Sequence, residues 1–191
     1  MLDTSGPPAA ESGRVVVVTG GATGIGAEIA ADFAALGAHV VVADLAEPRP
    51  DVAKAEFQPV DVSSDADLTA LVATTMDKYG RIDALVNCAA VYKALGAKAP
   101  LEDLTNDEWD RVLRVNVRGT WQAIKAVLPA MEQGGHILNV SSTTARNGSP
   151  GFAHYVASKA AVEGLTRAAR GPRPRTAASR RCSRPRPPSG G

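Results

Sequence analysis

The chain has 191 residues, of which 45% are hydrophobic and 21% charged, the composition of one ordinary globular domain. Its formal net charge of +1 averages two unlike parts: residues 1–169 carry 14 Lys and Arg (21 minus 7) against 20 acidic residues, and residues 170–191 add seven arginines and no acid. The total charge therefore identifies no partner, the two cysteines exclude a disulfide framework and a zinc site, and no apolar run reaches the roughly 18 residues of a membrane span.

The first 13 residues lack the basic start and the apolar middle of a secretory signal, so we expect a disordered arm there. Cys88 and Cys182 are the two cysteines of the chain, and this sparse usage favours a reducing cytoplasm. We expect Cys88 to be a small buried side chain within an apolar strand.

Short apolar runs alternate with longer segments of helical periodicity over residues 14–170. The first run, RVVVVTG, is β-branched and unbroken, which is typical of a strand buried on both faces. The helix after it places Ile25, Ile29, Phe33 and Leu36 on one face and ends at Gly37. In chain order the predicted elements are strand 14–20, helix 24–37, strand 38–44, strand 57–62, helix 63–80, strand 83–90, helix 105–133, strand 136–142 and helix 154–170.

This alternation predicts right-handed βαβ crossovers and therefore an α/β fold, a doubly wound, Rossmann-like parallel sheet with helices on both faces. We expect one domain over residues 14–170. After Arg170 the pattern stops, and the five prolines of GPRPRTAASRRCSRPRPPSGG forbid regular structure. Residues 171–191 are expected to be a disordered Arg/Pro-rich tail, and the sheet to be incomplete at its C-terminal side.

The segment TGGATGIG, residues 19–26, joins the first predicted strand to the first helix. Its glycines allow a sharp turn and a close approach to a pyrophosphate at the helix N-terminus, where free N–H groups point outward. The succession of strand, glycine loop, helix and later acid is the context that a dinucleotide site requires. The alternative is a tight turn that binds no ligand. The cofactor-binding candidates in this loop are Thr19, Gly20, Thr23, Gly24, Ile25 and Gly26.

Asp44 ends the second predicted strand, 18 residues beyond the glycine loop. A carboxylate there accepts hydrogen bonds from the adenosine ribose and repels a 2′-phosphate, so we expect NAD rather than NADP. Arg49 lies just beyond it, either as a solvated loop charge or as a group that changes this preference. Asp61, with Val62 beside it, either reaches the adenine or caps the following helix.

Tyr155 and Lys159 stand four residues apart at the start of the last predicted helix, so their side chains share one face. A phenol with a pKa of about 10 is a poor acid–base catalyst at neutral pH, and we expect the neighbouring ammonium to lower that pKa. Such a tyrosine exchanges a proton with an alcohol oxygen while hydride moves to or from a nicotinamide. Ser141 and Ser142 end the preceding strand at the carboxyl edge, where open α/β sheets bind ligands.

Taken together, these motifs resemble those of the short-chain dehydrogenase/reductase family, in the form with a T-G-x-x-x-G-x-G cofactor loop and a Y-x-x-x-K pair. The resemblance covers residues 14–169, and the motifs occur in the family's order. The matching residues are Thr19, Gly20, Gly24, Gly26, Asp44, Asn87, Asn116, Ser142, Tyr155 and Lys159.

The resemblance implies that Tyr155 is the proton donor and acceptor, and that Lys159 both tunes it and binds the nicotinamide ribose. It also implies that Ser142 bonds the substrate oxygen and that Asn116 holds a water that relays protons from Lys159. As alternatives, Ser141 or Ser142 could satisfy strand-end backbone groups. Asn116 could face solvent, although the valines on either side of it favour a buried position.

Two departures from the family pattern stand out. The fourth-strand motif, in which Asn87 is a cofactor-binding candidate, continues Cys88-Ala89-Ala90 where the family usually has Asn-Asn-Ala-Gly, a change that we expect the site to tolerate. A V-N-x-x-x-P-G strand and a lid, which the family places after the tyrosine helix, cannot be read beyond residue 170. We therefore hypothesise a truncated or frameshifted chain with weak NAD binding and little turnover, whose fifth strand forms an edge of the sheet.

The resemblance implies an NAD(P)-dependent oxidoreductase that interconverts a secondary alcohol and a ketone. It also implies a homo-oligomer in the full-length parent, packed through helices 105–133 and 154–170. Tyr92 and Phe152 could line an apolar substrate pocket or simply pack in loops. No metal and no membrane partner is expected.

The alternative function is a non-catalytic dinucleotide-binding module whose basic tail binds nucleic acid. The tail has no aromatic residue for base stacking, so nucleic acid is not the expected partner.

Overall fold

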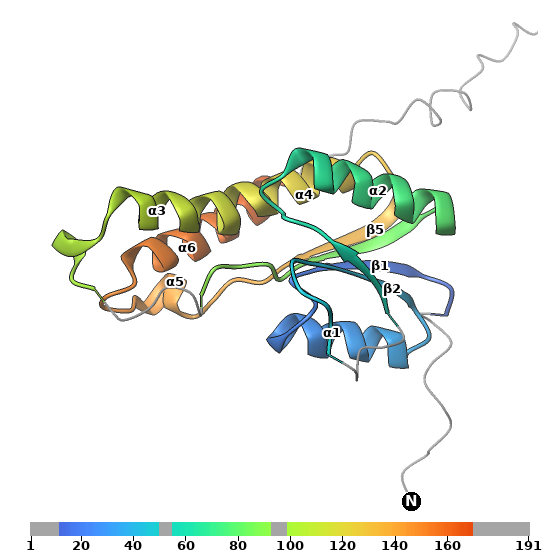
Figure 1. The fold of residues 1–191 in the computed structure, drawn as a ribbon, viewed down its shortest axis with the longest axis horizontal. Coiled ribbons are helices and arrows are strands. Elements are labelled where there is room, and N and C mark those ends of the chain that lie inside the picture. Colours follow the sequence, from blue (N-terminus) through green and yellow to red (C-terminus); the bar gives the residue numbers. More distant parts are fainter. Residues whose placement is uncertain (1–11, 50–54, 93–98, 170–191) are drawn as a thin grey trace, which may run out of the picture.

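The fold, seen in a computed structural model, is described for residues 12–49, 55–92 and 99–169, without the side chains of residues 132 and 133 (Figure 1). The predicted tail 171–191 and nearly all of the predicted arm 1–13 lie outside the described residues. In chain order the elements are β1 (Val15–Thr19), α1 (Gly24–Ala35), β2 (His39–Asp44), β3 (Glu56–Pro59), α2 (Asp65–Tyr79), β4 (Ile82–Asn87), η4 (Leu101–Asp103), α3 (Asn106–Leu113), η5 (Arg114–Gly119), α4 (Thr120–Val127), β5 (Met131–Asn139), α5 (Thr144–Asn147) and α6 (Ala153–Ala168).

The five strands form one parallel sheet in the order β3-β2-β1-β4-β5, which confirms the predicted doubly wound α/β class. From β1 the chain winds outward through β2 to β3, and it then returns to the other side of β1 for β4 and β5. The winding direction therefore reverses between β1 and β4, where the register pairs Thr19 with Asn87. Open sheets of this class bind ligands in the crevice at such a reversal, outside the carboxyl ends of the strands.

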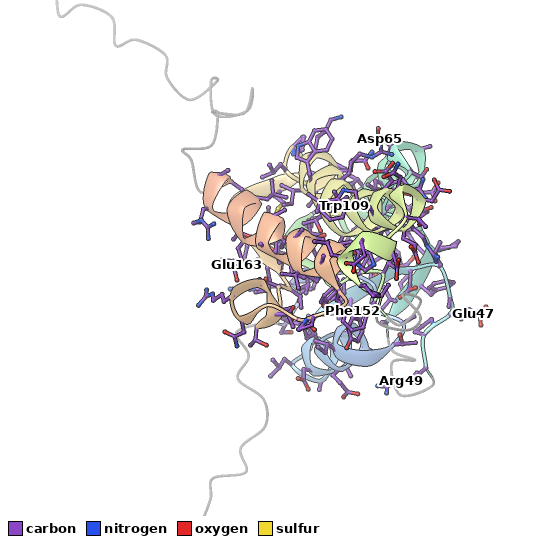
Figure 2. The ribbon with its side chains drawn as sticks, turned by 90° about the vertical axis from the view of Figure 1, so that its left-hand side faces the viewer. Glu47, Arg49, Asp65, Trp109, Phe152 and Glu163 are labelled. Atoms are coloured by element: carbon purple, nitrogen blue, oxygen red, sulfur yellow. The ribbon has the colours of Figure 1, made fainter. Side chains whose placement is uncertain are left out.

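Each face of the sheet packs on its own hydrophobic core, because alternate residues of a strand point to opposite faces. Val16 and Val18 belong to the core under α1, whereas Val17 belongs to the core under α2 and α4. Figures 1 and 2 show α1 on one side of the sheet and α2, α3, α4 and α6 on the other. The prediction that β1 is buried on both faces is confirmed, since all its residues are buried.

Helix α1 packs on the sheet through small residues, so the apolar face predicted for it is partly wrong. Gly26, Ala27 and Ala30 are its buried residues, while Ile25 is 66% exposed. The helix starts so close to the turn after β1 that large side chains do not fit between them. The predicted stop at Gly37 is confirmed by its φ of +87°.

The helix predicted over 105–133 consists of three segments and ends earlier than predicted. Its start is α3, with a capping box in which Thr105 and Glu108 bond each other's backbone N–H groups. At η5 the chain widens into a π-helical turn, and α4 then continues to Val127. The helix ends here because Pro129 follows. Proline lacks the N–H that a helix needs, and it disfavours helical backbone in the residue before it. Strand β5 accordingly begins at Met131, not at residue 136.

Strands β3, β4 and β5 each end three residues earlier than predicted, and the residues after them lie in loops. β3 ends at Pro59, so Asp61 follows the strand instead of closing it. β4 ends at Asn87, so Cys88 is a half-buried loop residue and the prediction of a buried strand position is wrong. β5 ends at Asn139, ahead of the two serines. Because the strands are parallel, all of these loops meet at one edge of the sheet.

A polar cluster joins the elements at the opposite edge. The Glu56 carboxylate, at the start of β3, accepts hydrogen bonds from Lys78 Nζ at 2.8 Å and Tyr79 Oη at 2.9 Å. The Tyr79 ring stacks on that of His39, at the start of β2, with centroids 5.0 Å apart. The hydrogen bond from Lys78 is the main cause that lowers the pKa of Glu56, and burial raises the pKa of Tyr79.

Among the described strands, β5 forms an edge of the sheet, as expected, and its Leu138 is 52% exposed. In the described ranges, no helix combines the length and the apolar character that crossing a membrane requires.

Candidate functional site

A cleft of about 870 Å³ opens at the carboxyl ends of the strands, over the reversal between β1 and β4. Ligand sites in proteins commonly have volumes of about 300–1,000 Å³, so the cleft can take a cofactor-sized molecule. The predicted residues that line it are Gly20, Thr23, Gly24, Ile25, Gly26, Asp44, Asp61, Val62, Ser142, Tyr155 and Lys159. Thr19, Asn87 and Asn116 are buried and do not line it.

The glycines of the turn after β1 are needed for different physical reasons. Gly20 has a φ of +67°, and a Cβ on it would lie 2.5 Å from the backbone N of Ala89. A Cβ on Gly26 would lie 2.1 Å from the Gly20 carbonyl oxygen, so this glycine lets α1 start directly against the turn. Thr23, the N-cap, makes no side-chain hydrogen bond to α1, which leaves the first N–H groups of the helix able to donate to an anion.

Asp44 organises the loops around its carboxylate at the end of β2. Its Oδ2 accepts from the N–H of Ala22 at 2.9 Å, and its Oδ1 accepts from the N–H of Leu45 at 2.7 Å. A carboxylate offers about four lone-pair sites, so Asp44 keeps capacity to accept from hydroxyl groups in the cleft. Arg49 pairs with Glu28 of α1 at 2.7 Å and does not line the cleft.

Asp61 lines the cleft and also shapes its own loop. Its Oδ1 accepts from the N–H and the hydroxyl of Ser63, at 2.8 and 2.7 Å. The N-cap of α2 is Ser64, so the alternative in which Asp61 caps that helix is wrong. Val62 packs closely on η5, since a Cβ on Gly119 would lie 2.7 Å from Val62 Cγ2.

Thr19 and Asn87 join neighbouring strands below the cleft. Thr19 Oγ1 donates to Asn87 Oδ1 at 3.4 Å, and Asn87 Nδ2 donates to Asn139 Oδ1 on β5 at 2.8 Å. Asn139 Nδ2 in turn donates to Thr166 Oγ1 on α6 at 3.0 Å. This chain of hydrogen bonds fixes α6 relative to the end of β1, where the glycine turn starts.

Asn116 lies in η5 with only 1% of its surface exposed, so the alternative in which it faces solvent is wrong. Its Oδ1 accepts from the N–H of Val91 at 2.7 Å, and its Nδ2 donates to Ser158 Oγ at 3.0 Å. Asn116 therefore fastens the loop after β4 to α6, at the residue next to Lys159.

Ser142, Tyr155 and Lys159 meet where the loops after β4 and β5 adjoin α6. The ammonium of Lys159 donates to the Val140 carbonyl at 2.8 Å and lies 5.8 Å from the centre of the Tyr155 ring. Ser142 Oγ accepts from the hydroxyl and the N–H of Thr144, at 2.9 and 3.3 Å, and Ser142 acts to lower the pKa of Tyr155. Ser141 instead donates to the Lys159 carbonyl at 3.1 Å, so it anchors α6, and Ser142 is the serine that faces the phenol.

The electrostatics of this group differ from the prediction. Burial raises the pKa of Tyr155 above its ordinary value, Ser142 opposes that change, and Tyr92 adds to it. The prediction that Lys159 lowers this pKa is wrong for this structure, in which the ammonium donates to the Val140 carbonyl. Burial also lowers the pKa of Lys159. Tyr155 is therefore protonated at neutral pH, as a proton donor to a carbonyl oxygen has to be.

Cys88 lines the cleft beside this group. Burial raises the pKa of its thiol to about 11, and the positive charge of Lys159 opposes that rise. The thiolate is the reactive form of cysteine, so Cys88 is not an activated nucleophile at neutral pH. Within the described residues, no group of three or more His, Cys, Asp or Glu side chains is placed to hold a metal ion.

Several residues of the cleft were not predicted. Leu45, 76% exposed, lines it directly after Asp44, and its position after a strand at the carboxyl edge could have identified it. Arg111 and Arg114 reach the cleft from α3 and η5. No sequence signal marks these arginines, because only the packing of the long helix brings them to the cleft.

Comparison with known proteins agrees with this geometry. The chain matches the family model of the short chain dehydrogenases over residues 14–176. It is 35% identical over 169 residues to the short-chain dehydrogenase/reductase ABA4 of Pyricularia oryzae, which covers 83% of this chain and 62% of that protein. It is 38% identical over 166 residues to the cyclopentanol dehydrogenase of a Comamonas species, which covers 81% of this chain and 65% of that protein.

Among solved structures, the ligand-free aldohexose dehydrogenase of Thermoplasma acidophilum superimposes with a TM-score of 0.78 at 31% identity. That match covers 84% of this chain and 62% of the other. The chain thus spans less than two thirds of the length of these relatives. The matched family model takes in both the glycine turn and the Tyr155–Lys159 pair. The chain belongs to the short-chain dehydrogenase family.

Proposed function

We propose that the chain carries the cofactor site and the reacting residues of an NAD-dependent oxidoreductase that interconverts a secondary alcohol and a ketone. One observation carries this proposal: a single cleft is lined both by the glycine turn with Asp44 and by Ser142, Tyr155 and Lys159. The relatives are dehydrogenases and reductases, which supports an oxidoreductase. One of these relatives is a cyclopentanol dehydrogenase, and cyclopentanol is a secondary alcohol. A cytoplasmic location stays a prediction.

The lining of the cleft suits a dinucleotide. The glycine turn and the N-terminus of α1 supply backbone N–H donors for a pyrophosphate. In this proposal Asp44 would accept from the adenosine ribose, Asp61 and Val62 would contact the adenine, and Lys159 would bind the nicotinamide ribose. The charge of Asp44 repels a 2′-phosphate, and Arg49 is paired with Glu28, so we propose NAD rather than NADP.

When bound, the nicotinamide supplies or accepts the hydride. In the direction of ketone reduction, Tyr155 donates a proton to the carbonyl oxygen, and its raised pKa keeps that proton available at neutral pH. Ser142 donates a hydrogen bond to the same oxygen and stabilises the charge that develops there. Asn116 positions the loop after β4 against α6, and its role as the holder of a relay water stays a prediction.

The test separates binding from chemistry in the purified chain. NADH is titrated and its fluorescence followed, and cyclopentanol is then offered with NAD⁺ while NADH formation is measured. We expect Tyr155→Phe to bind NADH within about twofold of the wild type. The wild-type turnover, which we expect to be low, should fall by about 100-fold or more in this variant because the proton donor is lost. Absence of NADH binding, or undiminished turnover in Tyr155→Phe, contradicts the proposal.

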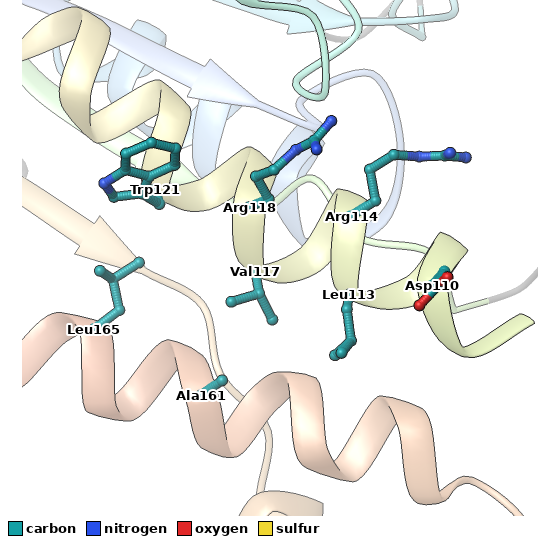
Figure 3. Close-up of a pocket in the computed structure, with 8 residues that line it drawn as sticks. All are labelled: Asp110, Leu113, Arg114, Val117, Arg118, Trp121, Ala161 and Leu165. Carbon is teal, nitrogen blue, oxygen red and sulfur yellow. The ribbon is translucent and has the colours of Figure 1, made fainter. Parts of the chain in front are cut away.

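We further propose that two copies of the chain associate through the long helix, which consists of α3, η5 and α4. A groove of about 740 Å³ lies between this helix and α6 (Figure 3). Leu113 and Val117 point toward α6 in it, and Trp121, one turn further on, is 45% exposed. Large apolar surface of this kind on a helix typically marks a protein interface.

The charges along the helix favour a second copy as the partner. Asp110, Arg114 and Arg118 follow one another at successive turns. Two antiparallel copies related by a twofold axis near Arg114 would set each Asp110 opposite the other copy's Arg118, and these two ion pairs have to outweigh the repulsion between the two Arg114 side chains. Light scattering should show a dimer or larger assembly, and a monomer for Trp121→Glu. A monomeric wild-type chain contradicts this proposal.

A further inference from the structure

Two aromatic side chains, Tyr92 and Phe152, lie near Tyr155 at the reacting end of the cleft, and neither donates the proton in the proposed reaction. The ring of Tyr92, in the loop after β4, lies 5.0 Å from that of Tyr155 with a tilt of 48°. It also lies 6.4 Å from the ring of Phe152, which Figure 2 shows at the start of α6. Tilted ring pairs at about 4.5–7 Å attract one another, so Tyr92 is held against the phenol that donates the proton.

A large part of Tyr92 remains free to contact a ligand. The residue lines the cleft and is 55% exposed despite its two ring neighbours. Binding pockets for small organic molecules are lined mainly by apolar and aromatic side chains. An exposed ring next to the reacting tyrosine therefore offers a stacking surface to whatever group is attached to the reacting carbon.

Together with Tyr92, the segments after β4 and β5 bring mainly apolar side chains to the cleft. Of the two serines among them, Ser141 already donates to the Lys159 carbonyl, and Ser142 is assigned to the reacting oxygen. Apart from Lys159, the charged residues in the described lining come from β2, the loop after β3 and the long helix. A polyhydroxylated substrate needs a partner for each buried hydroxyl, because an unpaired polar group is costly. The apolar side chains that the segments after β4 and β5 contribute are Ala89, Ala90, Val91 and Val140.

We propose that Tyr92 selects the substrate by stacking on an apolar ring, aromatic or alicyclic, attached to the carbon that reacts at Tyr155. The inference rests on the proposed function, because it takes Tyr155 as the proton donor. It makes a ring-bearing ketone or secondary alcohol the preferred substrate, and it disfavours ketones that carry only hydroxylated carbons.

The experiment measures binding, so it does not depend on turnover. Acetophenone, a ring-bearing ketone, and dihydroxyacetone, a ketone without a ring, are titrated into the purified chain by ligand-observed NMR, with and without NADH. The variants are Tyr92→Ala and Tyr92→Leu, which remove the ring, and Tyr92→Phe, the matched control that keeps the ring and loses the hydroxyl. Urea midpoints check that all variants are folded, which the exposure of Tyr92 favours.

We expect the wild type to prefer acetophenone, and its affinity to fall about fivefold or more in Tyr92→Ala and Tyr92→Leu. Tyr92→Phe should keep the affinity within about twofold, and NADH affinity should not change in any variant. Equal affinity for the two ketones, or an acetophenone affinity that survives loss of the ring, overturns the inference. A chain that shows ring-dependent acetophenone binding but binds no NADH supports the role of Tyr92 and contradicts the cofactor proposal instead.

Discussion

Replacing Gly26 with alanine tests whether the glycine turn depends on close contact between α1 and β1. The added Cβ would lie 2.1 Å from the Gly20 carbonyl oxygen and 2.9 Å from its carbonyl carbon. Both neighbours are backbone atoms, which cannot rotate away as a side chain does. Since ordinary contact begins at 3.4 Å, α1 has to retreat by about 1.3 Å (3.4 less 2.1) in a close-packed region.

Overpacking of this kind costs about 2–3 kcal/mol of unfolding free energy, which lowers the urea midpoint by about 1 M. The retreat also withdraws the N–H donors of α1, so NADH affinity should fall by about tenfold or more. Gly164→Ala is the matched control on α6, because the nearest atom to its added Cβ is Arg167 Nη2 at 3.9 Å. Alanine favours a helix over glycine by about 0.5–1 kcal/mol, so this variant should gain stability.

Circular dichroism during urea unfolding measures both variants, and NADH fluorescence measures the binding. A Gly26→Ala protein that unfolds at the wild-type midpoint refutes the contact argument. A Gly164→Ala protein that loses as much stability as Gly26→Ala shows that the effect belongs to the substitution and not to the turn.

Three further outcomes are expected. Asp44→Ser should shift the ratio of NADH to NADPH dissociation constants about tenfold toward NADPH, because it removes the charge that repels a 2′-phosphate; an unchanged ratio in fluorescence titrations speaks against Asp44 as the selector. Above a pH of about 10 the wild type should lose more stability than Tyr155→Phe. The pKa of Tyr155 is higher in the folded state than in the unfolded state, so the stability that the protonated phenol contributes is complete below the unfolded-state pKa and is lost as the pH rises through the folded-state pKa. Urea midpoints at about pH 8 and 11 compare the two proteins, and parallel losses would contradict the burial argument. The pKa of Glu56 is lowered from 4.5, so the stability that its carboxylate contributes is present above that value and is lost as the pH falls. Glu56→Gln should therefore lose less stability than the wild type on acidification. Equal losses would show that the hydrogen bond to Lys78 contributes nothing to stability.

The fold class follows from local patterns that act over a few residues. The unbroken runs of valine in β1 and β2 place apolar side chains on both faces of the sheet, so they predict a sheet that is covered on both faces. The stop at Gly37 could be predicted for the same reason, and α2 shows signals of the same local kind: Ser64 accepts from the N–H of Asp67 at its start, and Gly80 ends it with a φ of +71°.

The site could be predicted where a role depends on position after a strand or on spacing along a helix, and Tyr155 and Lys159 on α6 belong to the second kind. The glycine turn, Asp44 and Ser142 belong to the first kind, since parallel strands bring their ends together. Ile25 was assigned to the core because helical periodicity does not reveal how closely a helix lies to its sheet. The pKa of Tyr155 was predicted in the wrong direction because a spacing of four residues does not encode the burial of the phenol.

The cluster of His39, Glu56, Lys78 and Tyr79 lies at the pole of the molecule opposite the cleft. Thermal stability can therefore be engineered in this cluster while substrate selectivity is altered in the cleft, since no residue belongs to both. A library that randomises the residues around Tyr155 would start from a more stable protein if the cluster were stabilised first.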